Sequence, residues 1–442
     1  MSESAVAEPR HSLLDRLLGI FTEVRPGESV TALLMLANIF TIFVSYAIIK
    51  VIREPLILTG GGAEVKSYSA AFQAVLLIGF IPLYSWFSSR VSRMRLIVGV
   101  TIFFAINIQV FSMAVSVDVA GVGIAFYVWT GIFSLVIGTQ FWSYANDIYP
   151  KNVGDRLFPI IVIGMTAGNP LGSKIAGVLF AAGTKAQSIM HISTALLLLT
   201  LVFYWLVDRR EAGDVSQANA TEALAKGSGF MLVLRSKYLR MVALLIVVLN
   251  LVNTNGEYII GKLVTAQSEA QTAMEAGAFI GSFYGNYYFW VNILTLLIQA
   301  FVVSRIVKYL GFGGVLLALP IVAFGAYTAI AAGVAFSVIR WAKTAENSTD
   351  YSVMNTARQL LWLPTTREEK YKAKQAIDVF FTRLGDVVSA VVVFVGTTML
   401  AFDYTSFAAL NIVVIFVWLA LGVMIVRENR RLVALQDERE AA

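Results

Sequence analysis

The chain has 442 residues, of which 58% are hydrophobic and only 14% are charged, and its formal net charge is +6. Soluble domains carry roughly 25% charged residues, so this composition excludes a soluble enzyme, a disordered protein and a fibrous protein. We therefore predict an all-α polytopic membrane protein. With no cysteine and two histidines that are far apart in sequence, the chain has no thiol nucleophile and is expected to hold no metal. No catalytic triad or Walker motif is present either, so no catalytic residue and no cofactor are expected.

The apolar runs predict membrane-spanning helices of about 20 residues each. The seventh and the tenth of these runs are more polar than the others. We predict twelve helices, at residues 29–57, 67–87, 95–115, 120–146, 157–182, 189–207, 240–263, 277–304, 311–333, 335–362, 375–400 and 404–426.

The distribution of Lys and Arg predicts the orientation of these helices. With the N-terminus inside, cytoplasmic segments carry 24 basic residues and the opposite side carries about four, which are Arg53, Lys66, Lys185 and Lys262. This imbalance favours cytoplasmic termini and an even number of passes. No cleavable signal or transit peptide is recognisable in residues 1–28, and the expected location is a bacterial inner membrane.

The longest polar interruption divides the chain into two halves of six helices each. The expected division is a cytoplasmic segment 1–28, a six-helix bundle 29–207, a cytoplasmic linker 208–237, a second bundle 238–426 and a cytoplasmic tail 427–442. This layout is similar to the major facilitator architecture, in which the substrate site lies at mid-membrane between the halves. The expected partners are the lipid bilayer and a small solute, without nucleic acid, and the chain is expected to be a monomer.

The first expected helix contains three charged residues within one turn, Lys50, Arg53 and Glu54. Their spacing places them on one face. Two cations against one carboxylate favour a site for an anion, and the alternative is a structural ion pair between Lys50 and Glu54 at the outer interface. In the fifth helix, Lys174 is a further candidate, in a Gly-rich run that lacks the spacing of a P-loop.

Polar residues also interrupt the seventh and eighth helices. Asn253 and Glu257 would have to face protein or water rather than lipid. Asn286 lies among aromatic residues that either form an interfacial belt or stack on a planar ligand such as a nucleobase. We therefore predict that Asn253, Glu257 and Asn286 contribute to substrate recognition.

The tenth helix carries a stripe of polar residues at spacings of three and four, which ends in Asn355 and Arg358. This pattern favours a helix that lines a cavity, and the alternative is an amphipathic helix at the membrane surface. Arg suits phosphate or carboxylate because its planar fork binds two oxygens. Arg53 and Arg358 are accordingly expected to line one cavity from opposite halves.

Charged residues near the cytoplasmic ends of helices 4 and 11 are candidates for a gate. These are Asp147, Asp378, Arg383 and Asp386. Ion pairs between halves commonly form in one conformation and break in the other. The alternative is a solvated helix end without a gating role.

Three motifs resemble the ATP/ADP translocases of plastids and intracellular bacteria, a branch of the major facilitator superfamily. They are the run 46–64 around Lys50, the run Phe141–Asn146, and the run Lys370–Asp378 followed by Arg383-Leu-Gly385. The tenth helix, which ends in Leu361-Trp-Leu-Pro364, is similar too. The resemblance spans residues from about 30 to 400. It implies twelve helices and exchange of nucleotides across a membrane.

The chain departs from this family at several charged positions. The family lysine of helix 1 falls on Arg53, its helix 4 glutamate near Thr130 and its helix 7 glutamate on Asn253. The helix 11 lysine falls on Asp386, and three charged positions of helix 10 fall on Asn355, Arg358 and Gln359. The resemblance therefore implies the family's scaffold, whereas these changes mean that it does not fix the substrate.

We interpret the sequence as that of a secondary active transporter, working by alternating access, for an anionic solute that is nucleotide-like or phosphorylated. The resemblance favours an ATP/ADP antiporter, which is not an enzyme. One alternative is a proton-coupled transporter of another organic anion or glycan-like solute, with Glu257, Glu54 or Asp350 as the proton carrier. Alternatives of another class are a membrane scaffold or sensor and a lipid flippase.

Overall fold

The structure, a computed structural model, describes residues 13–18, 22–211, 229–269 and 272–441. Every regular element in these ranges is a helix. The elements in chain order are α1 (Leu13–Leu18), α2 (Glu28–Ser88), α3 (Arg93–Ser116), α4 (Val122–Ile148), α5 (Lys151–Ala181), α6 (Ala186–Glu211), α7 (Gly229–Arg235), α8 (Lys237–Ser268), α9 (Ala273–Phe301), α10 (Val303–Ala331), α11 (Phe336–Thr349), η1 (Asp350–Met354), α12 (Asn355–Leu360), η2 (Glu369–Ala373), α13 (Lys374–Ala376), η3 (Ile377–Phe381), α14 (Thr382–Thr398) and α15 (Tyr404–Ala441).

The expected spans agree with these helices. Each of the twelve overlaps a helix or a run of consecutive helices, and eight helical runs in the described ranges are long and apolar enough to cross a membrane. One of the eight, α2, contains two expected spans, whereas α5, α9 and α11 are not among the eight. The chain is therefore an all-α polytopic membrane protein, and the count of twelve spans is approximate.

The helix α2 reverses direction at Gly62. A straight helix of 61 residues would be about 90 Å long, three times the thickness of the bilayer core. At Gly62 the backbone has φ 73° and ψ −174°, a conformation that is open essentially only to glycine. The two spans that were expected with a loop at 58–66 are thus joined without one, and Pro55 neither ends nor interrupts the helix.

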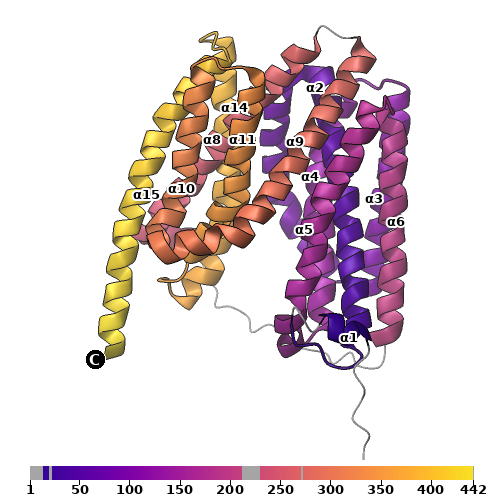
Figure 1. Cartoon of the computed structure of the whole chain (residues 1–442), viewed down its shortest axis with the longest axis horizontal. Coiled ribbons are helices and arrows are strands. Elements are labelled where there is room, and N and C mark those ends of the chain that lie inside the picture. Colours follow the sequence, from indigo (N-terminus) through magenta and orange to yellow (C-terminus); the bar gives the residue numbers. More distant parts are fainter. Residues whose placement is uncertain (1–12, 19–21, 212–228, 270–271, 442) are drawn as a thin grey trace, which may run out of the picture.

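Figure 1 shows the helices in two groups. One group contains α2 to α6, the other contains α8, α10, α11, α14 and α15, and α9 stands between them and packs against α5. Across the centre, α2 packs against α8, α9 and α14. Both α1 and the C-terminal end of α15 lie at the bottom of this view, at the same end of the molecule.

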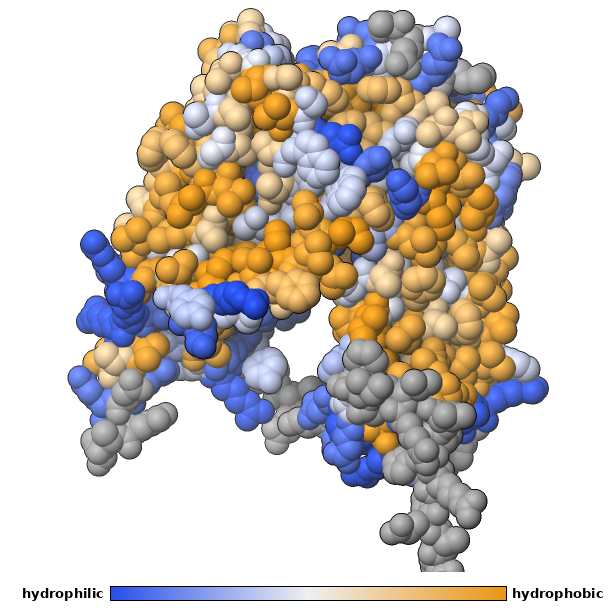
Figure 2. All heavy atoms as spheres, viewed as in Figure 1, coloured by the Kyte–Doolittle hydropathy of each residue, from blue (hydrophilic) through white to orange (hydrophobic). Residues whose placement is uncertain are grey.

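The surface has the polarity of a protein in a bilayer. Figure 2 shows a broad apolar band across both groups of helices, with hydrophilic residues concentrated at the two ends. Large apolar side chains such as Phe103, Ile321 and Phe416 are exposed on this surface. At the end that carries α1, the same figure shows the molecule hollowed between the two groups.

The expected tenth span is a single helical run with one irregular turn. The run passes from α11 through the π-helical segment η1 into α12. A π-helical turn closes i→i+5 hydrogen bonds and therefore changes the register of the side chains that follow it. The predicted polar stripe depended on 3.6 residues per turn along the whole helix. It is consequently not continuous beyond η1.

Candidate functional site

A cavity of about 190 Å³ lies where the two groups of helices meet. Side chains from α2 and α4 form one wall, and side chains from α8, α9, η1 and α14 form the other. The lining residues are Lys50, Arg53, Lys66, Ala70, Gln73, Tyr127, Asn253, Thr254, Glu257, Tyr288, Tyr351, Arg383 and Asp386. We refer to this space as the central cavity.

Glu54 organises the charges on one side of the central cavity. Its side chain is fully buried and accepts hydrogen bonds from Arg53 Nε at 3.1 Å and from the Tyr288 hydroxyl at 3.0 Å. Lys66 Nζ lies 2.7 Å from Glu54 Oε2 and 3.7 Å from Glu257 Oε2. Two cations therefore share one buried carboxylate, and the second carboxylate lies at the far side of Lys66.

Lys50 has a different environment from its neighbours. Its ammonium lies 4.2 Å from the centre of the Tyr288 ring, and the Arg53 guanidinium lies 4.5 Å from that of Tyr127. Among the described residues Lys50 has no ion pair, so the alternative of an i,i+4 pair with Glu54 is wrong in this conformation. A cation held on an aromatic face in a cavity keeps its N–H donors available for an anion.

The wall from the second half of the chain is polar and carries no excess of positive charge. Asn347 donates hydrogen bonds to Glu257 Oε1 at 3.0 Å and to the Tyr287 hydroxyl at 2.8 Å. Of these three residues, Glu257 lines the cavity and the other two do not. Asp386 accepts from Thr254 at 2.9 Å and pairs with Arg383 at 3.4 Å. Counting Glu54, the cavity presents four cations and three carboxylates, and the excess cation is the unpaired Lys50.

Four of the eight predicted substrate residues line this cavity: Lys50, Arg53, Asn253 and Glu257. The structure places the other four elsewhere, and so Arg53 and Arg358 do not line one cavity here. Lys174 is exposed against the Phe289 ring, Asn286 accepts a hydrogen bond from Arg340 at 2.6 Å, and Asn355 and Arg358 follow the π-helical turn.

The predicted gate residues do not form an ion pair between halves in this conformation. Arg383 and Asp386 line the central cavity, and the partners of Asp386 are Thr254 and Arg383, which belong to the same half. Asp147 lies 3.6 Å from Arg93 instead. Asp378 is exposed on η3, and within the described ranges it makes no ion pair with Arg383.

Sequence reasoning missed Lys66, which it assigned to an outer loop. Lys66 is 4% exposed and contacts both Glu54 and Glu257. The Gly60-Gly-Gly62 run was the available signal, since it permits a reversal that brings Lys66 back beside Glu54. Tyr127 and Thr254 were also missed. Tyr288 was noticed only as one of the aromatic residues of the eighth helix, and Tyr351 only as part of the polar stripe.

One end of the molecule is closed by contacts between the two halves. Glu64 accepts from Lys262 Nζ at 2.7 Å and from the Tyr258 hydroxyl at 3.0 Å. This end is opposite the one where Figure 2 shows the hollow. The central cavity therefore lies between a closed end and an open end.

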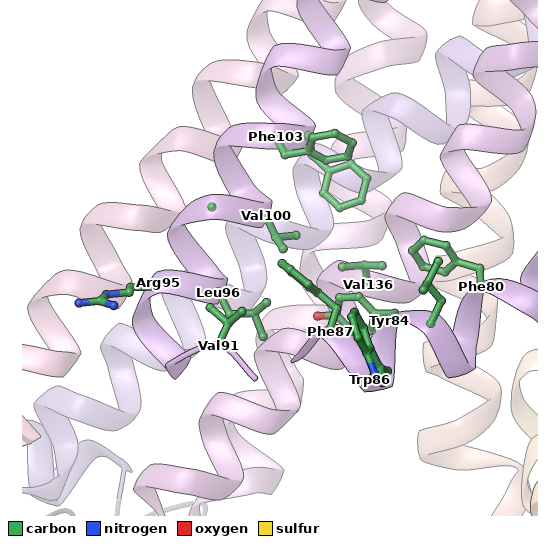
Figure 3. Close-up of a pocket in the computed structure, with 13 residues that line it drawn as sticks. Phe80, Tyr84, Trp86, Phe87, Val91, Arg95, Leu96, Val100, Phe103 and Val136 are labelled. Atoms are coloured by element: carbon green, nitrogen blue, oxygen red, sulfur yellow. The ribbon is translucent and has the colours of Figure 1, made fainter. Parts of the chain in front are cut away.

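A larger pocket, of about 570 Å³, lies on the side of the first half and is apolar. Figure 3 shows Phe80, Tyr84, Phe87 and Val100 around it, with Arg95 at its edge pointing away. Its walls come from the end of α2, α3 and α4, and its residues Leu83, Trp86 and Phe103 are exposed on the apolar surface. It lacks convergent polar groups, which a site for a charged solute needs.

Known transporters resemble this chain in sequence. The family model for the TLC ATP/ADP transporter matches residues 324–429, which include η1, α12 and α14. ADP,ATP carrier protein 1 of Chlamydia trachomatis is 22% identical over 304 residues, covering 59% of this chain and 56% of that protein. This chain is similar to the ATP/ADP transporters. The resemblance predicted from the motifs is thereby confirmed.

A second relative agrees with the first. ADP,ATP carrier protein 4 of Rickettsia prowazekii is 22% identical over 304 residues, covering 58% of this chain and 57% of that protein. The matches thus span a little over half of these relatives' length.

Solved structures of transporters share the fold. A bacterial homologue of the iron transporter ferroportin in its inward-facing state has a TM-score of 0.64 at 13% identity, covering 90% of this chain and 98% of that one. The nucleoside transporter NupG has a TM-score of 0.62 at 14% identity, covering 88% and 98%. The fold is therefore that of the major facilitator transporters, as the two-halves layout predicted.

Proposed function

We propose that the chain is a secondary active transporter that exchanges an anionic, nucleotide-like or phosphorylated solute across a membrane by alternating access. The observation that carries this proposal is Lys50, which lines a cavity between the two halves and has no ion pair within the described part of the chain. A cavity with an excess cation in a low-dielectric surrounding is neutralised when an anion binds.

The relatives support the choice of substrate class. Two of them are named ADP,ATP carriers, and a structural neighbour is named a nucleoside transporter. In the central cavity, phosphate oxygens would meet Lys50 and Arg53. A base would stack on Tyr351, whose side chain is 45% exposed and whose ring carries no cation, unlike the rings of Tyr127 and Tyr288.

The size of the cavity supports a conformational change on binding. Sites that enclose a drug-sized ligand measure about 300–1,000 Å³, and the central cavity measures about 190 Å³. A nucleotide would therefore need the two halves to move apart around it. The closed contact of Glu64 with Lys262 at one end, and the hollow at the other, supports an inward-facing state if α1 and the end of α15 are cytoplasmic.

The remaining parts of the proposal follow from the sequence. We place the chain in a bacterial inner membrane as a monomer with both termini inside, with two bundles at 29–207 and 238–426 joined by a cytoplasmic linker at 208–237. In this orientation Arg53 and Lys66 lie inside the protein rather than in outer loops, which leaves even fewer basic residues outside.

The test is exchange in proteoliposomes. Vesicles that contain the purified protein and are loaded with ADP should take up radiolabelled ATP or ADP, and Lys50→Gln should abolish most of this uptake. Loaded phosphate and sugar phosphates serve as competing counter-substrates. Binding of none of these anions, measured by thermal shift, would contradict the proposal, because a ligand stabilises the folded state by mass action.

A second candidate is a proton-coupled transporter of another organic anion or glycan-like solute. Asn253, at the position of a family glutamate, and Asp386, at the position of a family lysine, both line the cavity and favour a changed substrate. A flippase is less well supported, because the lateral pocket in Figure 3 is apolar and offers no path for a headgroup. A scaffold would show no uptake of any solute and should tolerate loss of the polar stripe of the tenth helix, whereas a transporter should not.

A further inference from the structure

A second cluster of charged groups is buried inside the second half of the chain, away from the central cavity. Lys343 Nζ lies 2.5 Å from Glu346 Oε2, and both side chains are buried. The Tyr327 hydroxyl receives a hydrogen bond from Lys343 at 3.1 Å and lies 2.9 Å from the Val252 carbonyl. These groups come from α8, α10 and α11, so the cluster joins three helices.

Gly256 provides the space for this cluster. A Cβ atom at Gly256 would lie 2.1 Å from the Tyr327 hydroxyl and 2.2 Å from Lys343 Nζ. Only a residue without a side chain therefore lets α8 approach the ammonium. Glu257, the next residue of α8, lines the central cavity. Adjacent residues of α8 therefore contact the two charged sites.

Asp350 lies one turn beyond Glu346, at the start of the π-helical segment η1. Both carboxylates line a small cavity of about 10 Å³, together with Leu249, Asn253, Leu319 and Trp418. Whereas Glu346 is paired with Lys343, Asp350 has no ion pair among the described residues. A cavity of this volume has room for about one water molecule.

Trp418 supplies an independent sign that this small cavity holds a polar group. Its side chain is 2% exposed, and its indole Nε1 has no hydrogen-bond partner among the residues that the structure describes. A buried donor without a partner is costly unless a water or another acceptor occupies the adjoining space. The cavity therefore combines an unpaired donor, an unpaired carboxylate and space for a single small group.

We propose that Asp350 is a proton-binding site, with one water in the small cavity linking its carboxyl group to the Trp418 indole. Asp350 makes no ion pair among the described residues, and a buried carboxylate without an ion pair is neutralised most simply by taking up a proton. Asp350 is partly accessible, so a proton can reach it.

A proton fits this site better than a metal ion. A hard cation such as Na⁺ or Ca²⁺ needs several oxygen ligands, whereas this cavity also presents an indole N–H and lies beside the ammonium of Lys343. The other polar and charged groups near Asp350 are Glu346 and Asn253, which line the same cavity, and the cations Arg358 and Lys343. Among them, the described residues provide one further carboxylate, Glu346, which is already neutralised.

Two contacts connect the proton site with the central cavity. Asn253 lines both spaces, and Asn347, between Glu346 and Asp350 in sequence, donates to Glu257 of the central cavity. Anion binding beside Asn253 and Glu257 would therefore change the polar surroundings of Asp350. This coupling, which rests on the proposed transport function, makes uptake of the anion depend on the proton gradient.

Infrared difference spectroscopy on the purified protein tests the proton site without any solute. Titration with base should reveal one protonated carboxyl band that disappears, and Asp350→Asn should lack this band. Trp418→Phe should keep the band but shift its titration midpoint to higher pH, by up to about tenfold in proton affinity. The indole N–H stabilises the charged carboxylate, so its removal favours the protonated form. The control Asp118→Asn removes an exposed carboxylate from a loop, where Asn tolerates the positive φ, and should leave the band unchanged. The same titrating band in Asp350→Asn would overturn the proposal.

Transport separates this proposal from the proposed function. In proteoliposomes with equal pH on both sides, Asp350→Asn should exchange ADP for ADP at a rate close to wild type. An imposed pH gradient should accelerate net ADP uptake several-fold in wild type and not in the variant. A stimulation that persists in Asp350→Asn would overturn the proton site, whereas absence of ADP exchange in wild type would overturn the proposed substrate and leave the spectroscopic result to decide.

Discussion

The ammonium of Lys66 lies 2.7 Å from the carboxylate of Glu54, although twelve residues of one helical run separate them. In a straight helix this interval would span about 18 Å. The contact therefore requires the reversal at Gly62, and it places a cation from the second span beside the charges of the first. The reversal builds the charged wall of the central cavity.

The reversal should depend on the absence of a side chain at position 62. Gly62→Ala should lower the free energy of unfolding by roughly 1–3 kcal/mol, because φ 73° with ψ −174° is strained for alanine. Gly60→Ala is the matched control, since nothing lies within 4 Å of its added Cβ. Thermal unfolding in detergent measures both, and equal stability of the two variants would contradict the assigned role.

Lys50, which is half-buried in the central cavity, should contribute more to anion binding than the exposed Lys174. A charge-assisted hydrogen bond contributes roughly 1.5–3 kcal/mol, so Lys50→Gln should weaken ADP binding about 10- to 100-fold. Lys174→Gln, on the exposed side of α5, should bind as wild type does. Titration calorimetry gives both dissociation constants, and a larger loss in the Lys174 variant would show that the central cavity is not the site.

Tyr351 should distinguish nucleotides from phosphate. Its ring lines the cavity and carries no cation, so Tyr351→Ala should weaken ADP binding by roughly 1–3 kcal/mol, the usual contribution of base stacking, and leave inorganic phosphate unaffected. Tyr351→Phe should retain ADP binding because the ring is kept. If both variants bind ADP equally well, the base does not stack on this residue.

The contact of Lys262 with Glu64 should stabilise the conformation that is closed at this end. Both side chains are partly exposed, so the pair contributes no more than about 1 kcal/mol. Lys262→Glu should therefore increase the population open at this end by about fivefold, and the exchange Glu64→Lys with Lys262→Glu should restore the balance. Distances between spin labels on Val119 and Met399, exposed at this end on opposite halves, report the populations.

The absence of native cysteine allows the orientation to be measured directly. A cysteine at Ser89, between α2 and α3, should react with a membrane-impermeant maleimide only from the cytoplasm. A cysteine at Val119, between α3 and α4, should react only from outside. Both positions are exposed, and one span separates them. The reverse pattern would place the termini outside.

The amino-acid sequence determined the parts of this protein that depend on one segment at a time. Apolar runs of sufficient length must become helices in lipid, because only a helix satisfies its own backbone hydrogen bonds there. The motifs of helices 1, 4–5 and 11 identified the relatives. The spacing of Lys50, Arg53 and Glu54 indicated a charged site in the first helix, and Asn253 and Glu257 were found because amides and carboxylates are costly against lipid.

Only the tertiary structure decided which of these residues meet. Lys66 joined the site because the chain reverses at Gly62, and a run of glycines specifies freedom of the backbone rather than its direction. Arg358 did not join, because the π-helical turn at Asp350–Met354 changes the register on which the stripe depended. Tyr327 contacts Lys343, and Thr254 contacts Asp386, from other helices. Contacts between segments distant in sequence leave no periodic signal within either segment.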